Sequence, residues 1–434
     1  MNRTTLIRRL VTVALPVIVA LAIPAAPALA QPPNLGRNFL WGVGSAGFQS
    51  EGSSPDSNWL RYSDSDRVHD PVGTSVDFRH RYVEDITNAK LMGVKVYRIS
   101  VEWARIQPKP GVWDQRELEY YDRVMHYILL SGMRPMITLD HWVYPGWAVD
   151  RGSWNNPNMV RDWLTNAKKV VDRYARFDPI WITVNEPLVY TFLKELSFGG
   201  IAPHNVPLML DQLVQAHRTI YDYIHARQPK AWVTSNSAYL PTVQPVLDSM
   251  FLDRIKDKQD FVGIDYYYSV AATDLNTYNA ATEKYWKAST SADGLYYALR
   301  YYDRKFPGKP LYIVENGMPT ENGAPRPDGY RRADQLRDAA YWLARAKADG
   351  MNVVGYNYWS ITDNYEWGSY TTRFGLYQVD VTTDRALLRR PTAAVAAYRD
   401  VIANGGVRSD YRPTRPAQFC SLVDAPTSCS QPVR

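Results

Sequence analysis

With 434 residues, 45% of them apolar, the chain can bury a large core, and its 22% of charged residues exclude a disordered polyelectrolyte. The formal net charge of +6 includes three arginines among residues 1–30, which contain no acid. The remainder therefore has 50 − 3 = 47 basic and 44 acidic residues, a net charge of +3. Because basic and acidic residues are interspersed, nucleic-acid binding gains no support and no nucleic-acid partner is expected.

The first 30 residues predict a signal peptide. Three arginines precede the apolar stretch 10–23, and Ala28-Leu29-Ala30 has the small-x-small form of a cleavage site. The apolar stretch is interrupted by Pro16 and is short for a membrane span. We therefore expect a secreted, extracellular protein with no stable membrane anchor after cleavage. A retained N-terminal anchor is the alternative.

The mature chain alternates between short apolar runs and longer amphipathic segments. The apolar runs predict strands at 39–44, 94–99, 135–139, 180–184, 231–235, 261–264, 311–314 and 353–358. Apolar positions that recur every three or four residues predict helices at 82–91, 116–130, 160–174, 208–227 and 334–348. Eight such alternations predict parallel strands closed into one (β/α)8 TIM barrel, spanning 31–407. An open doubly wound sheet is the structural alternative, but no Gly-x-Gly-x-x-Gly follows a strand.

The segment 408–434 forms a C-terminal tail rich in proline and serine. It holds the chain's two cysteines, Cys420 and Cys429, nine positions apart. Export predicts a disulfide between them, with two free thiols as the alternative. No spacing of Cys or His matches a metal site, so neither a metal nor a cofactor is expected.

Two of the predicted strands end in the same design, an apolar run followed by glutamate and turn residues. Glu186 and Pro187 follow the fourth strand closely, and Glu315, Asn316 and Gly317 follow the seventh. Either glutamate alone would ordinarily be a surface residue in a strand-to-helix turn. The C-terminal strand ends of a barrel, however, meet at one face, where active sites form. Two carboxyls in one pocket are the machinery that cleaves a glycosidic bond.

Polar and aromatic side chains follow most of the other strands. They are Gln49 and Glu51 after the first strand, Arg98 and Glu102 at the end of the second, Asp140, His141 and Trp142 after the third, Asp265 and Tyr267 after the sixth, and Trp359, Asp363, Glu366 and Trp367 after the eighth. Alone, His141 would be a core histidine and Arg98 an ion-pair residue at the barrel rim. Trp359 and Trp367 alone would be core aromatics. Their alignment along one barrel face predicts a shared site.

These stretches resemble glycoside hydrolase family 1, the β-glucosidase family, over about residues 38–405. The matching motifs are its N-terminal signature at 39–52, its acid/base motif at 185–187, its nucleophile motif at 315–317, and its closing segment at 359–367 and 373–376. The resemblance implies a retaining exo-β-glycosidase, most simply a β-glucosidase, that hydrolyses O-linked β-glycosides at the non-reducing end through a covalent glycosyl-enzyme intermediate. A transglycosylase that uses the same intermediate and a noncatalytic sugar-binding barrel are the alternatives.

The same resemblance implies a role for each site residue. Glu315 is the nucleophile and Glu186 the general acid/base. Arg98 is expected to keep Glu315 ionised, Tyr267 to donate a hydrogen bond to it, and Asn185 to bind the sugar 2-hydroxyl. The expected substrate-binding residues are Gln49, His141, Glu366 and Trp367 for hydroxyl recognition, Trp359 as the stacking platform, and Trp142 beside them.

Some positions indicate the subfamily, and two others depart from the family pattern. Glu186 stands where the thioglucosidases of the family have Gln, which favours an O-glycosidase. Residues 368–373 lack the phosphate-binding set of the phospho-glycosidases, so an unphosphorylated sugar is expected. Asp265 replaces the usual Asn; it could raise the pKa of a neighbouring Glu, or pair with Arg or a sugar hydroxyl. Val143 replaces the usual Asp, so we expect one polar contact near the sugar to be missing. Sugar epimer, aglycone and oligomeric state stay open.

Overall fold

The computed structural model describes residues 34–240, 243–268, 284–418, 420–421, 423–424 and 427–433. The chain divides into two contact units, Met1–Gln31 and Pro32–Arg434. The predicted signal peptide falls in the first unit and lies outside the described residues. Along the described ranges, no helix combines the length and the apolar character that a membrane span requires.

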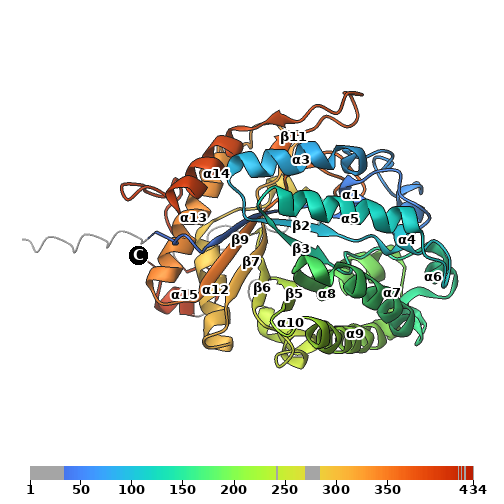
Figure 1. Ribbon diagram of the computed structural model, residues 1–434. Helices are drawn as coiled ribbons and strands as arrows, with labels where there is room; N and C mark the ends of the chain where they lie inside the picture. Colours follow the sequence, from blue (N-terminus) through green and yellow to red (C-terminus); the bar gives the residue numbers. More distant parts are fainter. Residues whose placement is uncertain are drawn as a thin grey trace, which may run out of the picture. The chain divides into compact units, whose positions relative to one another are not determined.

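Eight parallel strands close into a barrel, which confirms the predicted fold class (Figure 1). The strands are β1 (Leu40–Gly44), β2 (Val96–Ser100), β3 (Arg134–Thr138), β4 (Ile180–Asn185), β5 (Trp232–Ala238), β6 (Val262–Asp265), β7 (Leu311–Asn316) and β9 (Val353–Trp359). Each pairs with its neighbours in sequence order, and β9 returns to pair with β1. All eight predicted strands are present, with ends that differ by at most three residues from the prediction.

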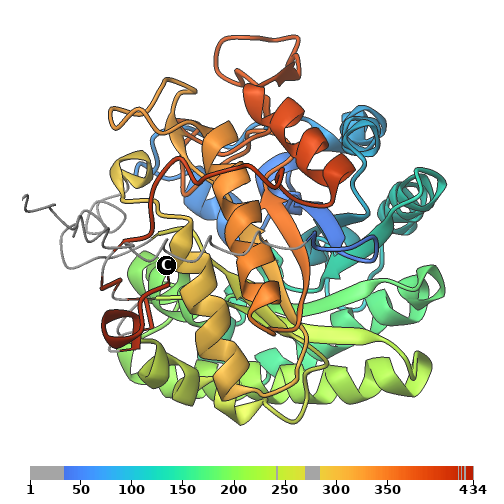
Figure 2. The same cartoon turned by 90° about the vertical axis from the view of Figure 1, so that its left-hand side faces the viewer.

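Helices surround the strands on the outside of the barrel (Figure 1). The long ones are α3 (Phe78–Met92), α5 (Gln115–Leu130), α7 (Met159–Tyr174), α9 (Val206–Arg227), α12 (Asp293–Lys305), α13 (Arg332–Ala348) and α14 (Ala393–Asn404). All five predicted helices are found, and α12 and α14 are additional. In Figure 2, α12, α13 and α14 lie next to one another on the face turned to the viewer.

Local sequence fixes where these helices begin and end. The side chain of Asp114 caps α5 by accepting hydrogen bonds from the backbone N–H groups of Arg116 and Glu117 at 2.9 and 3.2 Å. Gly93 ends α3 in the left-handed region, at φ 86°, which a residue without a Cβ adopts freely. These stops return the chain to the next strand within a few residues.

Shorter elements lie mostly in the connections. They are α1 (Gly47–Ser50), α2 (Asn58–Ser63), α4 (Trp103–Ile106), α6 (Gly146–Asp150), α8 (Pro187–Val189), α10 (Gln244–Met250), α15 (Thr427–Ser430) and a π-helix at Tyr190–Leu196, with the two-residue strands β8 (Thr320–Glu321), β10 (Thr372–Arg373), β11 (Tyr377–Gln378) and β12 (Arg390–Pro391). The first, fourth, seventh and eighth barrel strands all lead into such connections. The C-terminal face of the barrel is therefore built largely from irregular segments, which is where a barrel places its active site.

Alternate residues of the strands pack into two separate cores. Ile180 and Ile182 of β4, with Tyr312 and Val314 of β7, belong to a small buried cluster. Trp181, between the two isoleucines, belongs instead to the large cluster that includes the helices. This period of two is what a strand with both faces buried requires. The small cluster packs the barrel interior beneath the C-terminal strand ends.

The C-terminal tail packs against α12. Cys420 and Cys429 form a disulfide, the pairing expected from the sequence. Asp424 forms an ion pair of 2.8 Å with Arg300 of α12, and the backbone N–H of Val433 donates to the Tyr297 hydroxyl at 3.0 Å. The disulfide closes a short loop and so holds these contacts together.

Candidate active site

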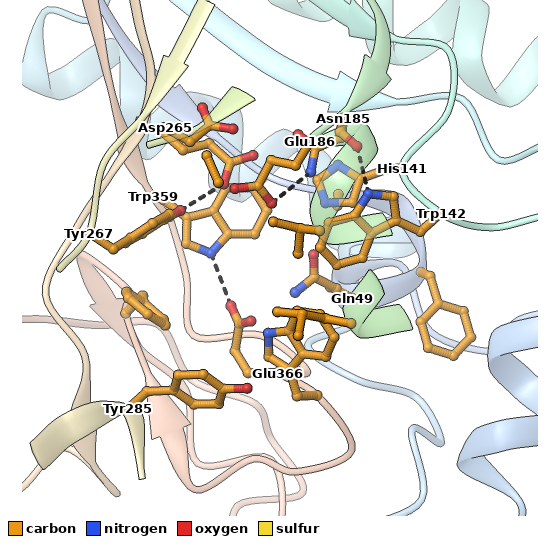
Figure 3. A pocket seen from close by; sticks show the side chains of 18 of the residues that line it. Gln49, His141, Trp142, Asn185, Glu186, Asp265, Tyr267, Tyr285, Trp359 and Glu366 are labelled. Atoms are coloured by element: carbon orange, nitrogen blue, oxygen red, sulfur yellow. Dashed lines mark hydrogen bonds between the residues drawn. The ribbon is translucent and has the colours of Figure 1, made fainter. Parts of the chain in front are cut away.

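A cavity of about 480 Å³ opens at the C-terminal ends of the barrel strands. Ten of the eleven predicted site residues line it: Gln49, His141, Trp142, Asn185, Glu186, Tyr267, Glu315, Trp359, Glu366 and Trp367 (Figure 3). The eleventh, Arg98, is fully buried behind Glu315. Asp265 and Val143, the two departures from the family pattern, also line the cavity. Val143 presents an apolar side chain there.

The two glutamates come from opposite walls of the barrel and meet in the cavity. Glu315 lies within β7, and Glu186 follows β4 directly, with φ 38° and Pro187 starting the next helix. A carboxylate oxygen of Glu186 lies within 4.8 Å of one of Glu315. Both side chains are buried. We call the polar end of the cavity, formed by Asn185, Glu186, Asp265, Tyr267 and Glu315, the floor.

Glu315 is surrounded by donors. The guanidinium of Arg98 donates to Glu315 Oε1, and the Tyr267 hydroxyl donates to Glu315 Oε2 at 2.7 Å. Arg98 is held in place because its Nε donates to Thr138 at 2.9 Å and its Nη2 donates to Asn185 Oδ1 at 2.6 Å. A positive charge and a hydroxyl donor both stabilise a carboxylate over a carboxylic acid. Glu315 is therefore prepared to be negatively charged.

Glu186 has the opposite environment. Burial, and then the negative charge of Glu315, raise the pKa of Glu186 well above its ordinary value. Among the described residues, the one hydrogen bond that its side chain receives is a long one of 3.4 Å from Asn185 Nδ2. Both effects favour the protonated form of Glu186. The floor pairs one charged carboxyl with one protonated carboxyl, as acid and nucleophile chemistry requires.

Asn236, on β5, contacts two residues of the floor and was missed by sequence reasoning. Its Nδ2 donates to Asn185 Oδ1 at 2.7 Å and also to Asp265 Oδ2. Asn185 Oδ1 thus accepts from both Arg98 and Asn236, so its own amide nitrogen must turn toward Glu186. The signal available in the sequence was weak, because Asn236 is one of four consecutive polar residues, 234–237, at the end of the fifth predicted strand.

A wall of aromatic and polar side chains adjoins the floor (Figure 3). The Trp359 indole N–H donates to Glu366 Oε1 at 2.9 Å, and the His141 ring stacks on Trp359 with centroids 5.8 Å apart. Burial raises the pKa of Glu366 to about 8. Burial, and then Arg98, lower the pKa of His141 well below its ordinary value, so its imidazole is neutral. This wall offers hydroxyl partners beside a flat ring, as sugar binding needs.

Trp142 and Trp367 complete the wall. Their rings lie 5.2 Å apart, and both residues have positive φ, 69° and 52°. Such backbone strain in bulky residues is typical of functional sites. The Trp142 indole N–H donates to the backbone carbonyl of Asn185 at 2.6 Å. Trp142 therefore offers a cavity ligand its ring surface while its N–H positions Asn185.

The outer part of the cavity is apolar. We call it the mouth; its residues are Val189, Leu193, Phe198, Tyr239 and Leu240. Leu193 and Leu240 are 52% and 42% exposed, although both are large aliphatic residues. Leu193 lies in the π-helix Tyr190–Leu196, an irregularity common at functional sites. The carboxyls that line the described cavity all belong to the floor or to Glu366, so the mouth carries none.

A (β/α)8 barrel that brings two differently ionised glutamates together beside an aromatic wall is the architecture of a glycoside hydrolase. The family model for glycosyl hydrolase family 1 matches residues 32–251 and 227–407. The chain belongs to glycosyl hydrolase family 1 and is a glycoside hydrolase.

Relatives agree with this assignment. β-Glucosidase A of Acetivibrio thermocellus is 28% identical over 450 residues, which cover 85% of this chain and 98% of the relative. The chloroplastic galactolipid galactosyltransferase of Arabidopsis thaliana is 29% identical over 343 residues, which cover 70% of this chain and 54% of that relative. The solved structure of the β-glucosidase from Thermotoga maritima in complex with azafagomine superimposes with a TM-score of 0.75 at 23% identity. It covers 86% of this chain and 100% of its own, and at that identity the likeness concerns the fold.

Proposed function

We propose that the protein is a retaining exo-β-glycosidase whose preferred substrates are O-linked β-glucosides. The observation that carries the proposal is the separation of the two carboxyls, whose oxygens come within 4.8 Å. Retaining glycosidases hold their carboxyls about 5–5.5 Å apart, whereas inverting enzymes leave about 6.5–9.5 Å for a water molecule. The short separation favours direct attack by one carboxylate.

In the first half of the reaction, a Glu315 oxygen attacks the anomeric carbon while the bond from that carbon to the leaving oxygen breaks. Glu186 gives its proton to the leaving oxygen, and the aglycone departs as an alcohol. Arg98 and Tyr267 hold the attacking carboxylate in its charged form and fix its direction. The product is a sugar ester of Glu315.

In the second half, water replaces the aglycone beside Glu186. Once Glu315 is an ester, its negative charge is gone, and one cause of the raised pKa of Glu186 is gone with it. The Glu186 carboxylate can then take a proton from water as the water oxygen attacks the anomeric carbon and the ester bond breaks. Two inversions return the sugar with its β configuration, and Glu186 is protonated again.

The polar groups of the cavity gather at one end, which supports exo action on a single sugar ring. Asn185 turns its amide nitrogen into the floor, where it can donate to the sugar 2-hydroxyl. Glu366, His141 and Gln49 offer partners for the remaining hydroxyls, and Trp359 offers its face to the ring. The preference for glucose is suggested by the bacterial relatives, which are named as β-glucosidases.

A panel of nitrophenyl β-glycosides tests the proposal, with proton NMR of the first sugar released. Turnover of the β-glucoside with the β anomer as the initial product is expected, and a 2-deoxy-2-fluoro glucoside should label the peptide that contains Glu315. Initial release of the α anomer would refute retention. Complete lack of turnover across the panel, with sugar binding intact, would favour the noncatalytic barrel.

The proposal extends to export, because residues 1–30 have the composition of a signal peptide. The disulfide between Cys420 and Cys429 supports it, since such bonds persist mainly outside the cytosol. N-terminal sequencing of protein recovered from the medium should begin at Gln31. Recovery of the full-length chain in membranes would support a retained anchor instead.

Transglycosylation is a second candidate that the apolar mouth favours. A mouth formed by Leu193, Phe198 and Leu240 suits an alcohol with an apolar chain better than it suits water. The galactosyltransferase relative is named for transfer rather than hydrolysis. Product analysis at rising concentrations of a medium-chain alcohol distinguishes transglycosylation from hydrolysis. A yield of alkyl glucoside that exceeds the yield of free glucose indicates transfer, and glucose as the single product indicates hydrolysis.

A further inference from the structure

A third buried carboxyl lies in the floor beside the two glutamates. Asp265 is the last residue of β6, and in the sheet it pairs with Glu315 of β7. It is only 1% exposed. One oxygen from each of Asp265, Glu186 and Glu315 lies within 4.8 Å of the other two. In Figure 3, Asp265 and Glu186 lie along the edge of the site opposite Gln49 and Glu366.

The two oxygens of Asp265 differ. Oδ2 accepts a hydrogen bond from Asn236 Nδ2, whereas Oδ1 is buried and has no hydrogen-bond partner among the described residues. A bare carboxylate oxygen buried without a donor is costly. A carboxylic acid lowers that cost, because the proton on Oδ1 removes the buried charge while Oδ2 still accepts from Asn236.

The charged groups around Asp265 also favour its protonated form. Glu315 faces it from β7, Glu186 from the end of β4, and Arg98 from β2, while Tyr267 lies two residues beyond the end of β6. Arg98, the one cation among these groups, donates its hydrogen bonds to Glu315, Asn185 and Thr138 and none to Asp265. Burial, then Glu315, then Glu186 raise the pKa of Asp265 well above its ordinary value. One guanidinium cannot balance three carboxylates at this distance.

We propose that Asp265 is a positioning residue that carries a proton in the resting enzyme and acts as a neutral, amide-like hydrogen-bond partner beneath the two glutamates. Its Oδ2 holds Asn236, and Asn236 fixes the orientation of Asn185. Its neutrality leaves Glu315 as the one charged carboxyl of the three. Asp265 keeps its proton through both halves of the reaction, so Glu186 alone exchanges protons with the leaving group and with water. The kinetic part of this inference rests on the proposed glycosidase function.

Two substitutions of Asp265 should have very different effects on activity. Asp265→Asn preserves the size, the neutral charge and the acceptor for Asn236, so kcat/KM on a nitrophenyl β-glucoside should fall by no more than about fivefold, the value of one ordinary hydrogen bond. Asp265→Leu has a similar branched shape but is larger and has no acceptor, so Asn185 loses its alignment and kcat should fall by about 100-fold. If Asp265 donated a proton to the substrate, Asp265→Asn would lose as much activity as Glu186→Gln.

Two measurements need no substrate and therefore test Asp265 even if the proposed function fails. A group whose folded-state pKa lies above its unfolded value of about 3.9 loses its contribution to stability as the pH rises between the two values. The Tm of Asp265→Asn minus the Tm of the wild type should therefore increase by at least about 2 °C from pH 4 to pH 7. Infrared spectra at pH 7 should show that Asp265→Asn lacks one protonated-carboxyl carbonyl band of the wild type.

Asp410→Asn is the matched control, because Asp410 is exposed and pairs with Arg408, far from the cavity in the sequence and outside its lining. It makes the same carboxyl-to-amide change and should leave kcat and the carbonyl bands close to those of the wild type. Its exposed pair with Arg408 lowers the pKa of Asp410, so any change of its Tm difference with pH should be small and opposite in sign to that of Asp265→Asn. A constant Tm difference between Asp265→Asn and the wild type across pH 4–7, or an unchanged infrared spectrum, would overturn the proposal. Lack of turnover by the wild type itself would instead count against the glycosidase function alone.

Discussion

The floor and the mouth of the cavity are built on different principles. The polar groups of the floor are held by directed hydrogen bonds. Arg98, which is fully buried next to the floor, donates to Thr138, Asn185 and Glu315. In the mouth, Leu193 and Leu240 lie about half exposed and offer no directed bond. The floor can therefore enforce one geometry on a sugar, whereas the mouth can discriminate only by apolar contact area. Substitutions in the two regions should differ in size and in kind.

A smaller contrast exists within the floor itself. Glu315 receives donors from Arg98 and Tyr267, while Glu186 receives one long bond from Asn185. Two residues of the same type therefore enter the reaction in different ionisation states. The surroundings decide this difference, because the side chains are identical.

Glu315→Gly should have the largest effect, because it removes the nucleophile and leaves no group to replace it. We expect kcat to fall by about four orders of magnitude or more. Azide, which is small enough to enter the space left by the side chain, should restore part of the turnover of an activated glucoside and give the α-glycosyl azide. Glu321→Gly, at an exposed glutamate of β8, is the control and should remain active. Wild-type turnover by Glu315→Gly would refute the nucleophile assignment.

Glu186→Ala should have the next largest effect, and the loss should depend on the leaving group. Without the acid, alkyl glucosides should lose about 10²–10⁴-fold in kcat/KM, while dinitrophenyl glucosides, whose leaving group needs no proton, should lose far less in the first step. Because burial and Glu315 raise the pKa of Glu186, the acid form persists to higher pH, and wild-type kcat/KM should fall as the pH rises through that raised pKa. The alkaline limb should vanish in the variant. Equal losses for all leaving groups would remove Glu186 as the acid.

Arg98→Met should slow the reaction through Glu315. Without the guanidinium, the Glu315 carboxylate loses the donor at Oε1 that fixes its direction of attack, so kcat on a nitrophenyl β-glucoside should fall by about 100-fold. Arg389→Met is the matched control, since Arg389 is also a buried arginine and pairs with Asp85 at 2.9 Å without lining the cavity. It should lower the stability and leave kcat close to that of the wild type; an unchanged kcat in Arg98→Met would contradict the role assigned to Arg98.

The fold could be predicted where local pattern and tertiary environment agree. Each barrel strand is a short apolar run, and both of its faces are buried, so the eight strands were visible in the sequence. Helices α12 and α14 were not predicted, for different reasons. α12 is buried over most of its length, including its polar residues Asp293 and Arg300, so its burial goes beyond the apolar stripe on which the prediction relied. α14 is rich in alanine, which fits either face of a helix.

The floor was predictable from the sequence, and the mouth was not. Glu186 and Glu315 stand directly after apolar strands, so chain position alone brings them to the same face. Asn236 acts only through contacts with Asn185 and Asp265 that no sequence pattern encodes. The question that the sequence left open at Asp265 has a partial answer: its hydrogen bond comes from Asn236 rather than from an arginine. Leu193 faces the cavity because of a π-helix, whose spacing differs from the period used to predict helices.

Leu193→Ser should have the smallest effect and should be selective. If the mouth holds the aglycone, kcat/KM for wild-type enzyme should rise along a series of alkyl β-glucosides, by up to about fourfold for each methylene that leaves water. In Leu193→Ser this rise should flatten, while methyl β-glucoside should be hydrolysed at nearly the wild-type rate because its aglycone does not reach the mouth. Leu130→Ser is the control, since Leu130 is 79% exposed on α5 and does not line the cavity. A uniform loss along the series would mean that Leu193 supports the floor, and the division between floor and mouth would then fail.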